Sequence, residues 1–443
     1  MNSKSNRKNG FTLIETMIGV AVFAIVVLAC YQVFDTLMTA VISSKAKVTA
    51  TALANEEFEI IRNLPYSNVG VVAGIPVGKI PRTQTLTRNG FAFNVQTTIR
   101  SIDDPFDGTF GGSPNDTSPA DYKLADLDIT CPRCKSFNPL GFTTLIAPRT
   151  LETLTTNGVL NMQVIDASGV SIPGAAIHIV NTHTSPTTTI DETTDNTGWF
   201  KIVDAPTGTN VYNITATKAG YSQDQTYPIG GVAGATPVKP DSTVTAGQTT
   251  QLSFAIDRLS TLNVSTVNAS CVATPSIGFS LTGAKLIGTP SVLKYTAHTF
   301  TTDTNGILSV PSLEWDTYST LLTSASYDLA GASLLPTFSL SPNTTASLQL
   351  IAVPHVNMAL LVSVKDANNI PIDGATVTLT KTGFNQTKTT NSGACATPGQ
   401  TFWNGLASGT YTLTVSKIGY QTNTNSALSI STAWKNQIVT LTP

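Results

Sequence analysis

The sequence has little charge and few of the side chains that usually bind metals. Charged residues are 12% of the 443 residues, roughly half the share of an average soluble protein. The net charge is −2, and no basic run appears after residue 8, which argues against a nucleic-acid partner. Five cysteines and four histidines are scattered along the chain. They are too few and too dispersed for a metal-rich protein.

The sequence also lacks the motifs on which most enzyme assignments rest. No phosphate-binding loop, Ser/His/Asp pattern or His/Glu metal cluster can be assembled with convincing spacing. His178 and His183 lie around a predicted strand end, where isolated histidines are more common than metal ligands. Asp191, Asp195 and Asp303 lie in predicted turns, where Asx-turns account for them without calcium. We therefore predict no catalytic residue, no metal site and no cofactor, and we do not expect an enzyme.

What the sequence does contain is one long uncharged apolar run at residues 16–34. Such a run can cross the ~30 Å hydrocarbon core of a bilayer as a helix at ~1.5 Å per residue. Lys4, Arg7 and Lys8 precede it without an acid, so the N-terminus is expected to stay in the cytoplasm. Glu15 is the exception at the start of the run. Because a carboxylate there costs at least a few kcal/mol without a partner, Glu15 is predicted to be functional.

Residues 8–15 read KNGFTLIE and immediately precede the apolar run. This stretch resembles the N-terminus of type IV prepilins and pseudopilins. The resemblance implies that prepilin peptidase removes residues 1–10 as a cytoplasmic leader, cleaving between Gly10 and Phe11, and that the new N-terminal Phe11 is methylated. It also implies that Glu15 pairs with the terminal ammonium of a neighbouring pilin subunit during assembly. Two opposite charges that are each costly in lipid would then offset one another.

Two other export signals are weaker explanations of the same segment. An ordinary secretory signal has an uninterrupted apolar core and a small-x-small cleavage site, whereas Glu15 interrupts this core and no clean Ala-x-Ala follows. A lipoprotein signal is the stronger alternative, because Ala29 precedes Cys30 near the end of the run. Leu28 fits that signal poorly, so Cys30 is predicted to be a lipid-facing or packing residue.

The helical pattern continues beyond the membrane segment. Between residues 36 and 64, apolar side chains recur close to a heptad spacing, at Leu37, Val41, Val48, Leu53, Ile60 and Leu64. Pro65 disfavours helical geometry at the residue before it. We therefore predict one helix over residues 11–64, with a transmembrane half at about 14–36 and a second half that packs on a globular head.

The head is predicted over residues 65–150. Alternating apolar side chains predict strands at 90–102, 122–130 and 141–146. A stretch rich in Gly, Pro and Asp at 103–120 predicts a long surface loop. This order of a helix, strands, a loop and strands resembles the head of a pilin, and the residues around 53–66 resemble minor pilins in particular.

Cys131-Pro-Arg-Cys134 lies between two predicted strands of the head. A thioredoxin-like motif would open a helix, and a zinc knuckle would need two further ligands. Neither requirement is met at this place in the sequence. A short local disulfide is favoured over free thiols in an oxidising compartment. The sequence leaves the pairing of Cys271 and Cys395 open.

Beyond residue 148 the sequence repeats itself. A Pro-Gly-Ala turn at 173–175 recurs as Asp-Gly-Ala at 373–375, and Lys-Ala-Gly-Tyr at 218–221 recurs as Lys-Ile-Gly-Tyr at 417–420. Between them, Asp-Thr-Asn-Gly at 303–306 marks a divergent copy. Short strands rich in Val, Ile and Thr, with a period of about 100 residues, predict tandem β-sandwiches.

The first and third copies resemble the carboxypeptidase regulatory-like, transthyretin-like family of seven-stranded sandwiches. The resemblance implies spacer or binding modules and not peptidases. We expect sandwiches at 159–258, 259–352 and 355–443. The third copy also resembles repeats of Gram-positive adhesins, but the acid needed for an isopeptide bond is missing before Gly419. Large aromatic residues are predicted to fill cores or module junctions: Trp199, Trp315, Tyr318 and Trp403.

Together these patterns predict an α+β pilin module, with a long helix and a small antiparallel sheet, followed by three all-β Ig-like sandwiches. The predicted function is a minor pilin-like subunit of a type IV pilus or related filament, with sandwiches for adhesion or for a tip or priming role. It would begin as a single-pass membrane protein with a cytoplasmic N-terminus and end in a cell-surface filament.

The expected partners are prepilin peptidase, other pilin subunits contacted through the helix, the membrane, and an unidentified host, surface or carbohydrate ligand. Two alternatives remain open at this point. One is a pseudopilin of type II secretion. The other is a membrane-anchored or lipid-anchored surface binding protein outside any pilus.

Overall fold

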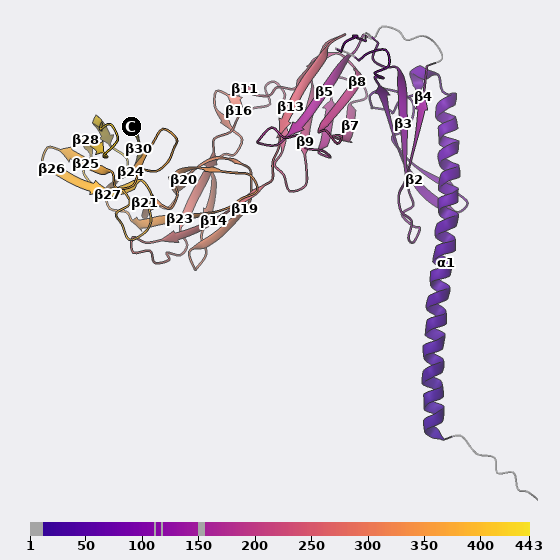
Figure 1. Cartoon of the computed structure of the whole chain (residues 1–443), viewed down its shortest axis with the longest axis horizontal. Helices are drawn as coiled ribbons and strands as arrows, with labels where there is room; N and C mark the ends of the chain where they lie inside the picture. The colour runs from indigo at the N-terminus through magenta and orange to yellow at the C-terminus, as the bar shows by residue number, and fades with distance from the viewer. Residues whose placement is uncertain (1–11, 110–111, 117, 149–155) are drawn as a thin grey trace, which may run out of the picture.

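A computed structural model describes residues 12–109, 112–116, 118–148 and 156–443. Its first element is a single helix, α1, Leu13–Asn63, of 51 residues, which is about 77 Å long at ~1.5 Å per residue. The Thr12 side chain accepts a hydrogen bond from the Glu15 backbone amide and caps the helix. The helix ends before Pro65, as expected. Figure 1 shows α1 extending far beyond the head that packs on it.

The two halves of α1 have different environments. The second half packs on the head through mostly small side chains: Ser43, Ala46, Thr49, Ala50, Leu53, Ala54, Glu57, Phe58 and Ile61. The predicted contact stripe is therefore mostly wrong, because Leu37, Val41, Val48 and Ile60 are exposed. Alanines spaced four residues apart let a sheet approach the helix closely. The face of α1 that carries these alanines is therefore the face buried against the sheet of the head.

The head is a four-stranded antiparallel sheet in the order β1-β2-β3-β4. A short 3-10 helix, Tyr66–Asn68, precedes it. The strands are β1 Thr83–Arg88, β2 Phe91–Ile102, β3 Tyr122–Thr130 and β4 Leu140–Ile146. The three predicted strands are confirmed to within one residue at each end. Strand β1 was not predicted, because it is an edge strand with Leu86 as its one apolar residue.

The chain then forms a first sandwich, defined here as strands β5 to β13. Its sheets have the orders β13-β5-β8 and β10-β9-β6-β7, and β12 pairs with β9. The bounds are β5 Gly158–Ile165, β6 Ala176–Asn181, β7 Thr188–Thr193, β8 Trp199–Ala205, β9 Gly208–Thr217, β10 Asp224–Gln225, β11 Thr236–Pro237, β12 Ser242–Val244 and β13 Thr249–Ala255. Strand β11 pairs with a strand of the next sandwich.

The second sandwich, β14 to β23, has sheets in the orders β19-β14-β23-β21 and β18-β15-β20-β22. Its strands are β14 Ser260–Val267, β15 Gly278–Gly283, β16 Leu286–Thr289, β17 Val292–Leu293, β18 His298–Thr301, β19 Ile307–Leu313, β20 Asp316–Leu322, β21 Tyr327–Ala332, β22 Thr337–Leu340 and β23 Thr345–Pro354. Strands β16 and β17 form a separate small sheet with β11, which links this sandwich to the first.

The third sandwich, β24 to β30, has sheets in the orders β27-β24-β30 and β26-β25-β28-β29. Its strands are β24 Met358–Lys365, β25 Thr376–Lys381, β26 Phe384–Thr389, β27 Gln400–Leu406, β28 Gly409–Ser416, β29 Asn423–Ile430 and β30 Trp434–Thr440. Figure 1 shows the three sandwiches leading away from the head in a row.

All three sandwiches share one strand arrangement. The first strand of each lies between its last strand, which runs parallel to it, and a middle strand, which runs antiparallel. The strands concerned are β5 with β13 and β8, β14 with β23 and β19, and β24 with β30 and β27. The divergent second copy therefore shares this arrangement with the other two, and it carries one additional strand, β21, beside its last strand β23.

Each sandwich also has one fully buried tyrosine in an equivalent place. The hydroxyl groups of Tyr212, Tyr318 and Tyr411 each donate to a backbone carbonyl four to six residues upstream, at 2.6 to 2.8 Å. A buried hydroxyl needs such a partner. The predicted core position of Tyr318 is confirmed, and so is that of Trp403, which is 1% exposed.

Candidate functional site on the N-terminal helix

The predicted processing and assembly residues lie at the free end of α1. Gly10 and Phe11 are outside the described residues. Glu15 lies in the first turn of α1 and is exposed. Its backbone amide donates to the Thr12 hydroxyl at 3.3 Å, and its negative charge at a helix N-terminus is favourable. The structure thus places Glu15 in the first turn of α1, and in sequence Glu15 lies four residues after the predicted new N-terminus.

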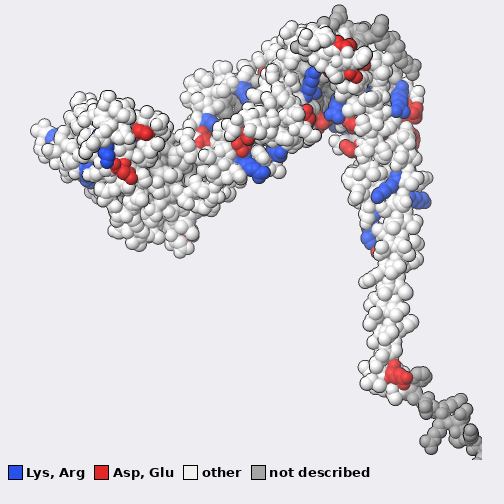
Figure 2. Space-filling view, viewed as in Figure 1, with Lys and Arg blue, Asp and Glu red and all other residues white. Residues whose placement is uncertain are grey.

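The half of α1 that follows Glu15 is apolar on every side. In the described part of the chain, α1 is the one helix long and apolar enough to span a membrane, and its most apolar 18-residue window has 0% buried residues. Figure 2 shows this half as an uncharged column with acidic atoms at its free end. Large side chains such as Phe23, Leu28 and Phe34 are exposed. Such a surface needs a bilayer or other helices around it.

The cysteines form two disulfides. Cys131 and Cys134 are bonded in the turn between β3 and β4, with their Cα atoms 5.3 Å apart. Cys271 and Cys395 are bonded across 124 residues and join the second sandwich to the third. Cys30 is a free, exposed cysteine on the apolar half of α1. The Cys131–Cys134 pair does not open a helix, so the arrangement that lowers a thiol pKa in redox motifs is absent from this turn.

Two of the three predicted turn aspartates, Asp195 and Asp303, accept hydrogen bonds within their turns, and His178 pairs with Asp191 across two strands. Asp195 and Asp303 each accept backbone amides from residues two and four positions ahead, at 2.8 to 3.0 Å, which confirms Asx-turns. The prediction for Asp191 is wrong, because it lies within strand β7. It pairs with His178 on the neighbouring strand β6 at 2.6 Å. Cross-strand pairing brought together two residues that are far apart in sequence.

The head contacts the first sandwich at what we call the head junction. The Thr189 amide donates to the Ala73 carbonyl at 3.0 Å, and the Arg82 guanidinium donates to the Thr189 carbonyl. Ile75, from the head, is buried in the core of the first sandwich. Lys201 forms an ion pair with Asp103. The junction therefore combines the apolar contact of Ile75 with several polar contacts.

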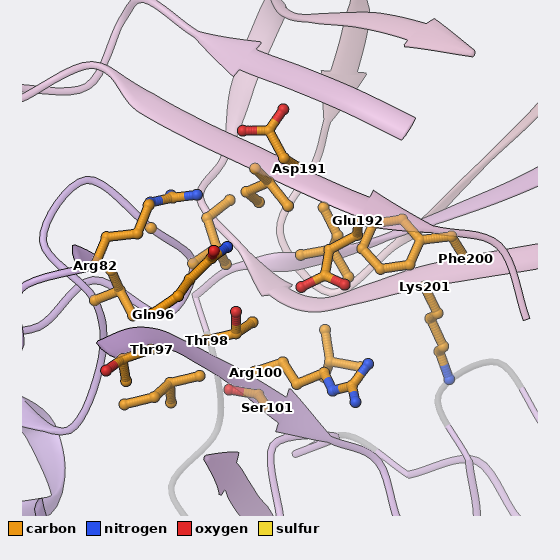
Figure 3. Close-up of a pocket in the computed structure, with 17 residues that line it drawn as sticks. Arg82, Gln96, Thr97, Thr98, Arg100, Ser101, Asp191, Glu192, Phe200 and Lys201 are labelled. Atoms are coloured by element: carbon orange, nitrogen blue, oxygen red, sulfur yellow. The ribbon is translucent and has the colours of Figure 1, made fainter. Parts of the chain in front are cut away.

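A small cavity of about 50 Å³ lies within the head junction. Figure 3 shows the Glu192 carboxylate and the Arg100 guanidinium pointing into the same space, whereas Asp191 points away from it. Burial raises the pKa of Glu192, and the Arg100 guanidinium opposes this rise. A cavity of this size has room for water but not for a substrate. The cavity lies between polar side chains of the head and of the first sandwich.

A larger groove of about 420 Å³ lies between the first and second sandwiches. Tyr221, Tyr227 and Tyr295 line it, and burial raises the pKa of the last two. Glu314 at its wall is held by two lysine ammonium groups at 2.7 Å each. Its size is within the range of pockets that bind small ligands. Trp315 is half-buried at this end of the sandwich and lies under the Lys285 ammonium.

The second and third sandwiches meet at what we call the distal junction. The Gln400 side chain is 1% exposed and bonds both the amide and the carbonyl of Ala332, at 3.0 and 2.8 Å. The Trp434 indole donates to the Leu329 carbonyl at 2.8 Å. Leu361 of the third sandwich is buried in the core of the second. The Cys271–Cys395 disulfide closes the same junction.

Sequence reasoning missed one group of acidic residues. Asp103, Asp116 and Asp121, defined here as the aspartate cluster, each place a carboxylate oxygen within 4.8 Å of the others. They lie in the long loop between β2 and β3. No spacing in the sequence marks such a cluster, because the loop must fold back before its two ends and its middle meet.

Two family models match the chain. The prokaryotic N-terminal methylation motif matches residues 5–31, and the carboxypeptidase regulatory-like domain matches residues 159–257 and 359–442. The chain has a prepilin-type N-terminus joined to carboxypeptidase regulatory-like domains. The methylation motif includes Gly10, Phe11 and Glu15. The second sandwich lies outside both matches, although its strand arrangement is that of the first and third.

Three of the solved structures that match parts of this chain are the following. The Bacillus anthracis TIE protein is 14% identical, with a TM-score of 0.20, covering 82% of this chain and 61% of that protein. A streptococcal ancillary pilin is 12% identical, with a TM-score of 0.18, covering 64% and 98%. The shaft pilin SpaA from Lactobacillus rhamnosus GG is 12% identical, with a TM-score of 0.17, covering 45% and 98%.

The chain thus spans less than two thirds of the length of the TIE protein. At these TM-scores the likenesses carry no conclusion about function. A comparison with curated proteins gave no match.

Proposed function

We propose that this chain is a minor subunit of a type IV pilus or a related filament. The observation that carries the proposal is the match to the methylation motif at residues 5–31, which includes the start of the exposed apolar half of α1. Prepilin peptidase would cleave between Gly10 and Phe11 and methylate Phe11. The apolar half of α1 would then leave the membrane by packing among the helices of neighbouring subunits. The role is structural and involves no catalysis.

Glu15 supplies the proposed assembly contact. A carboxylate at the start of an apolar helix and a terminal ammonium are each costly in a membrane. Pairing them between two subunits removes both costs at once, provided that the helices lie side by side with a small offset. The exposure of Glu15 leaves its carboxylate accessible to a neighbouring subunit.

The three sandwiches favour a minor role over a major one. They lead away from the head over residues 158–440 (Figure 1), so an array in which every subunit carried them would be crowded. We infer incorporation at the filament tip or at sparse positions, with the sandwiches presented for adhesion. The groove between the first and second sandwiches is large enough to hold a small surface ligand.

The test is Glu15→Ala in the native cells, with filaments sheared from the surface. Cleavage should proceed normally, because the peptidase acts at the Gly10 junction. Incorporation should fall at least tenfold, because an unpaired ammonium costs about 2.5 kcal/mol or more in the membrane. Immunoblots of filaments and membranes measure both effects. Glu59→Ala is the matched control, since Glu59 is exposed on α1 outside the apolar half.

Gly10→Glu should block cleavage and so provides a reference for the uncleaved chain. The mass of the N-terminal peptide of the wild-type chain shows which maturation pathway the protein follows. An N-methylated Phe11 supports the proposal, whereas a lipidated Cys30 or an intact Met1 contradicts it. Normal incorporation of the Glu15→Ala chain would rule out the charge-pairing mechanism. Copy numbers equal to those of the major subunit would rule out the minor role. A chain that is processed but joins only a secretion pseudopilus would assign it to that machinery instead.

A further inference from the structure

The aspartate cluster lies where the long loop of the head leaves and rejoins the sheet. Asp103 follows the end of β2, and Asp121 precedes the start of β3. The Asp121 amide donates to the Ile102 carbonyl at 3.1 Å, which holds the two ends together. Asp116, from the middle of the loop, completes the cluster. Antiparallel pairing of β2 with β3 therefore brings together carboxylates separated by up to 18 residues.

Burial of these carboxylates is a separate observation. The Asp103 side chain is 2% exposed, and Asp116 as a whole is 8% exposed. Asp116 Oδ1 accepts the Ser118 amide at 2.7 Å. Its second oxygen, Oδ2, is buried and has no hydrogen-bond partner among the described residues. A buried carboxylate oxygen without a donor is costly and uncommon in proteins, so this atom indicates a ligand.

We propose that Asp103, Asp116 and Asp121 bind a calcium ion. Oxygens up to 4.8 Å apart match a shared Ca²⁺, whose ligands lie about 2.3–2.6 Å from the metal. Mg²⁺ binds oxygens at about 2.0–2.1 Å in a strict octahedron and fits a loop of this kind less well. The cluster contains neither histidine nor cysteine, which argues against zinc.

The electrostatics of the loop favour a divalent ion. Three carboxylates this close repel one another strongly inside a protein. Lys201, from strand β8 of the first sandwich, donates to Asp103 and supplies one positive charge. A calcium ion would supply two more and would join the middle of the loop to the ends of β2 and β3. Because Asp103 also contacts Lys201, the ion would order the edge of the head junction.

The test is equilibrium dialysis of the full chain in detergent micelles against radioactive calcium chloride. The wild-type chain should bind about one ion, with a dissociation constant of about 0.1–1 mM, as in extracellular modules. Asp116→Asn should weaken binding at least about tenfold, because it removes a charged ligand. Asp107→Asn is the matched control, since Asp107 is exposed in the same loop and should leave binding unchanged.

Asp121→Asn and thermal unfolding keep the proposal testable if Asp116→Asn folds poorly. Calcium should raise the midpoint temperature of thermal unfolding of the wild-type chain above the midpoint measured in EGTA. In the Asp121→Asn variant, calcium should raise this temperature much less. Magnesium chloride at the same concentration should produce a much smaller rise. The proposal is overturned if the wild-type chain shows no saturable binding at about 10 mM calcium. It is equally overturned if Asp121→Asn binds calcium as Asp107→Asn does.

Discussion

The two ends of the row of sandwiches are attached in different ways. At the distal junction, a disulfide, a buried glutamine and a shared apolar core join the second sandwich to the third. At the head junction, Ile75 is the buried apolar contact, and ion pairs and hydrogen bonds surround a small polar cavity. Both junctions connect neighbouring modules of one chain. They should nevertheless respond differently to force, salt and pH.

The difference follows from the kind of side chain that each junction buries. At the distal junction, the stabilisation from buried apolar side chains and from the hydrogen-bonded Gln400 amide is lost only when the two sandwiches separate completely. The Lys201–Asp103 ion pair buries its carboxylate but leaves the lysine side chain 36% exposed, so salt can still screen it. We therefore expect the second and third sandwiches to unfold as one body. The head junction should open more easily and give the sandwiches some freedom relative to the filament.

The largest effect should come from removing the distal disulfide with Cys271→Ser and Cys395→Ser together. Chain-entropy arguments for a loop of 124 residues give about 4–5 kcal/mol of stabilisation, with losses of about 2–5 kcal/mol typical for native disulfides. Urea unfolding followed by tryptophan fluorescence should show that the second and third sandwiches are less stable without the disulfide. Their single unfolding transition should separate into two transitions.

The matched control removes the disulfide between Cys131 and Cys134, which spans only three residues. The same argument gives about 2 kcal/mol for so short a loop, and the loss should be confined to the head. If the distal transition stays single and unshifted without its disulfide, the noncovalent contacts alone hold the two sandwiches together. The difference between the distal junction and the head junction would then come from side-chain packing and not from the disulfide.

A smaller effect is expected from Gln400→Ala. This change leaves the amide and carbonyl of Ala332 buried without their partner, at a cost of about 2–4 kcal/mol for two such groups. The free energy of unfolding of the distal pair, measured in urea, should fall by that amount. Gln386→Ala on exposed strand β26 is the control and should change stability by less than about 0.5 kcal/mol. Equal effects of the two changes would contradict the role of Gln400.

The smallest effect concerns the pH dependence of the head junction. Burial raises the pKa of Glu192 above its ordinary value of 4.5, so the folded chain holds this proton more tightly than the unfolded chain does. Its favourable contribution is complete below pH 4.5 and is lost as the pH rises through the folded pKa. The protection of the Thr189 amide, which crosses the junction, should therefore fall as the pH rises above 4.5.

Hydrogen exchange, corrected for the intrinsic rates, measures this protection. Glu192→Gln should flatten the profile, because the amide cannot ionise. Glu59→Gln, at an exposed helical position, should leave the profile as in the wild type. A profile unchanged by Glu192→Gln would contradict the assignment of the pH response to Glu192.

Much of the fold could be predicted because its signals are local. Alternation of apolar residues located β2, β3 and β4, and repeated glycine turns located the sandwiches. The predictions failed where a contact decided the outcome. The buried face of α1 follows its alanines and not its larger apolar residues. Strand β1 has weak local character and exists because β2 offers it an edge.

By itself the sequence determined the long helix with its apolar half, the carboxylate of Glu15 at the start of that half, and the repeated sandwich modules. Each of these depends on spacing within a short window, where helix and strand periodicities are set by backbone geometry. Only the tertiary structure decided the Cys271–Cys395 pairing, the two junctions and the aspartate cluster. These features join residues that are distant in sequence, and their proximity depends on how whole sheets pack.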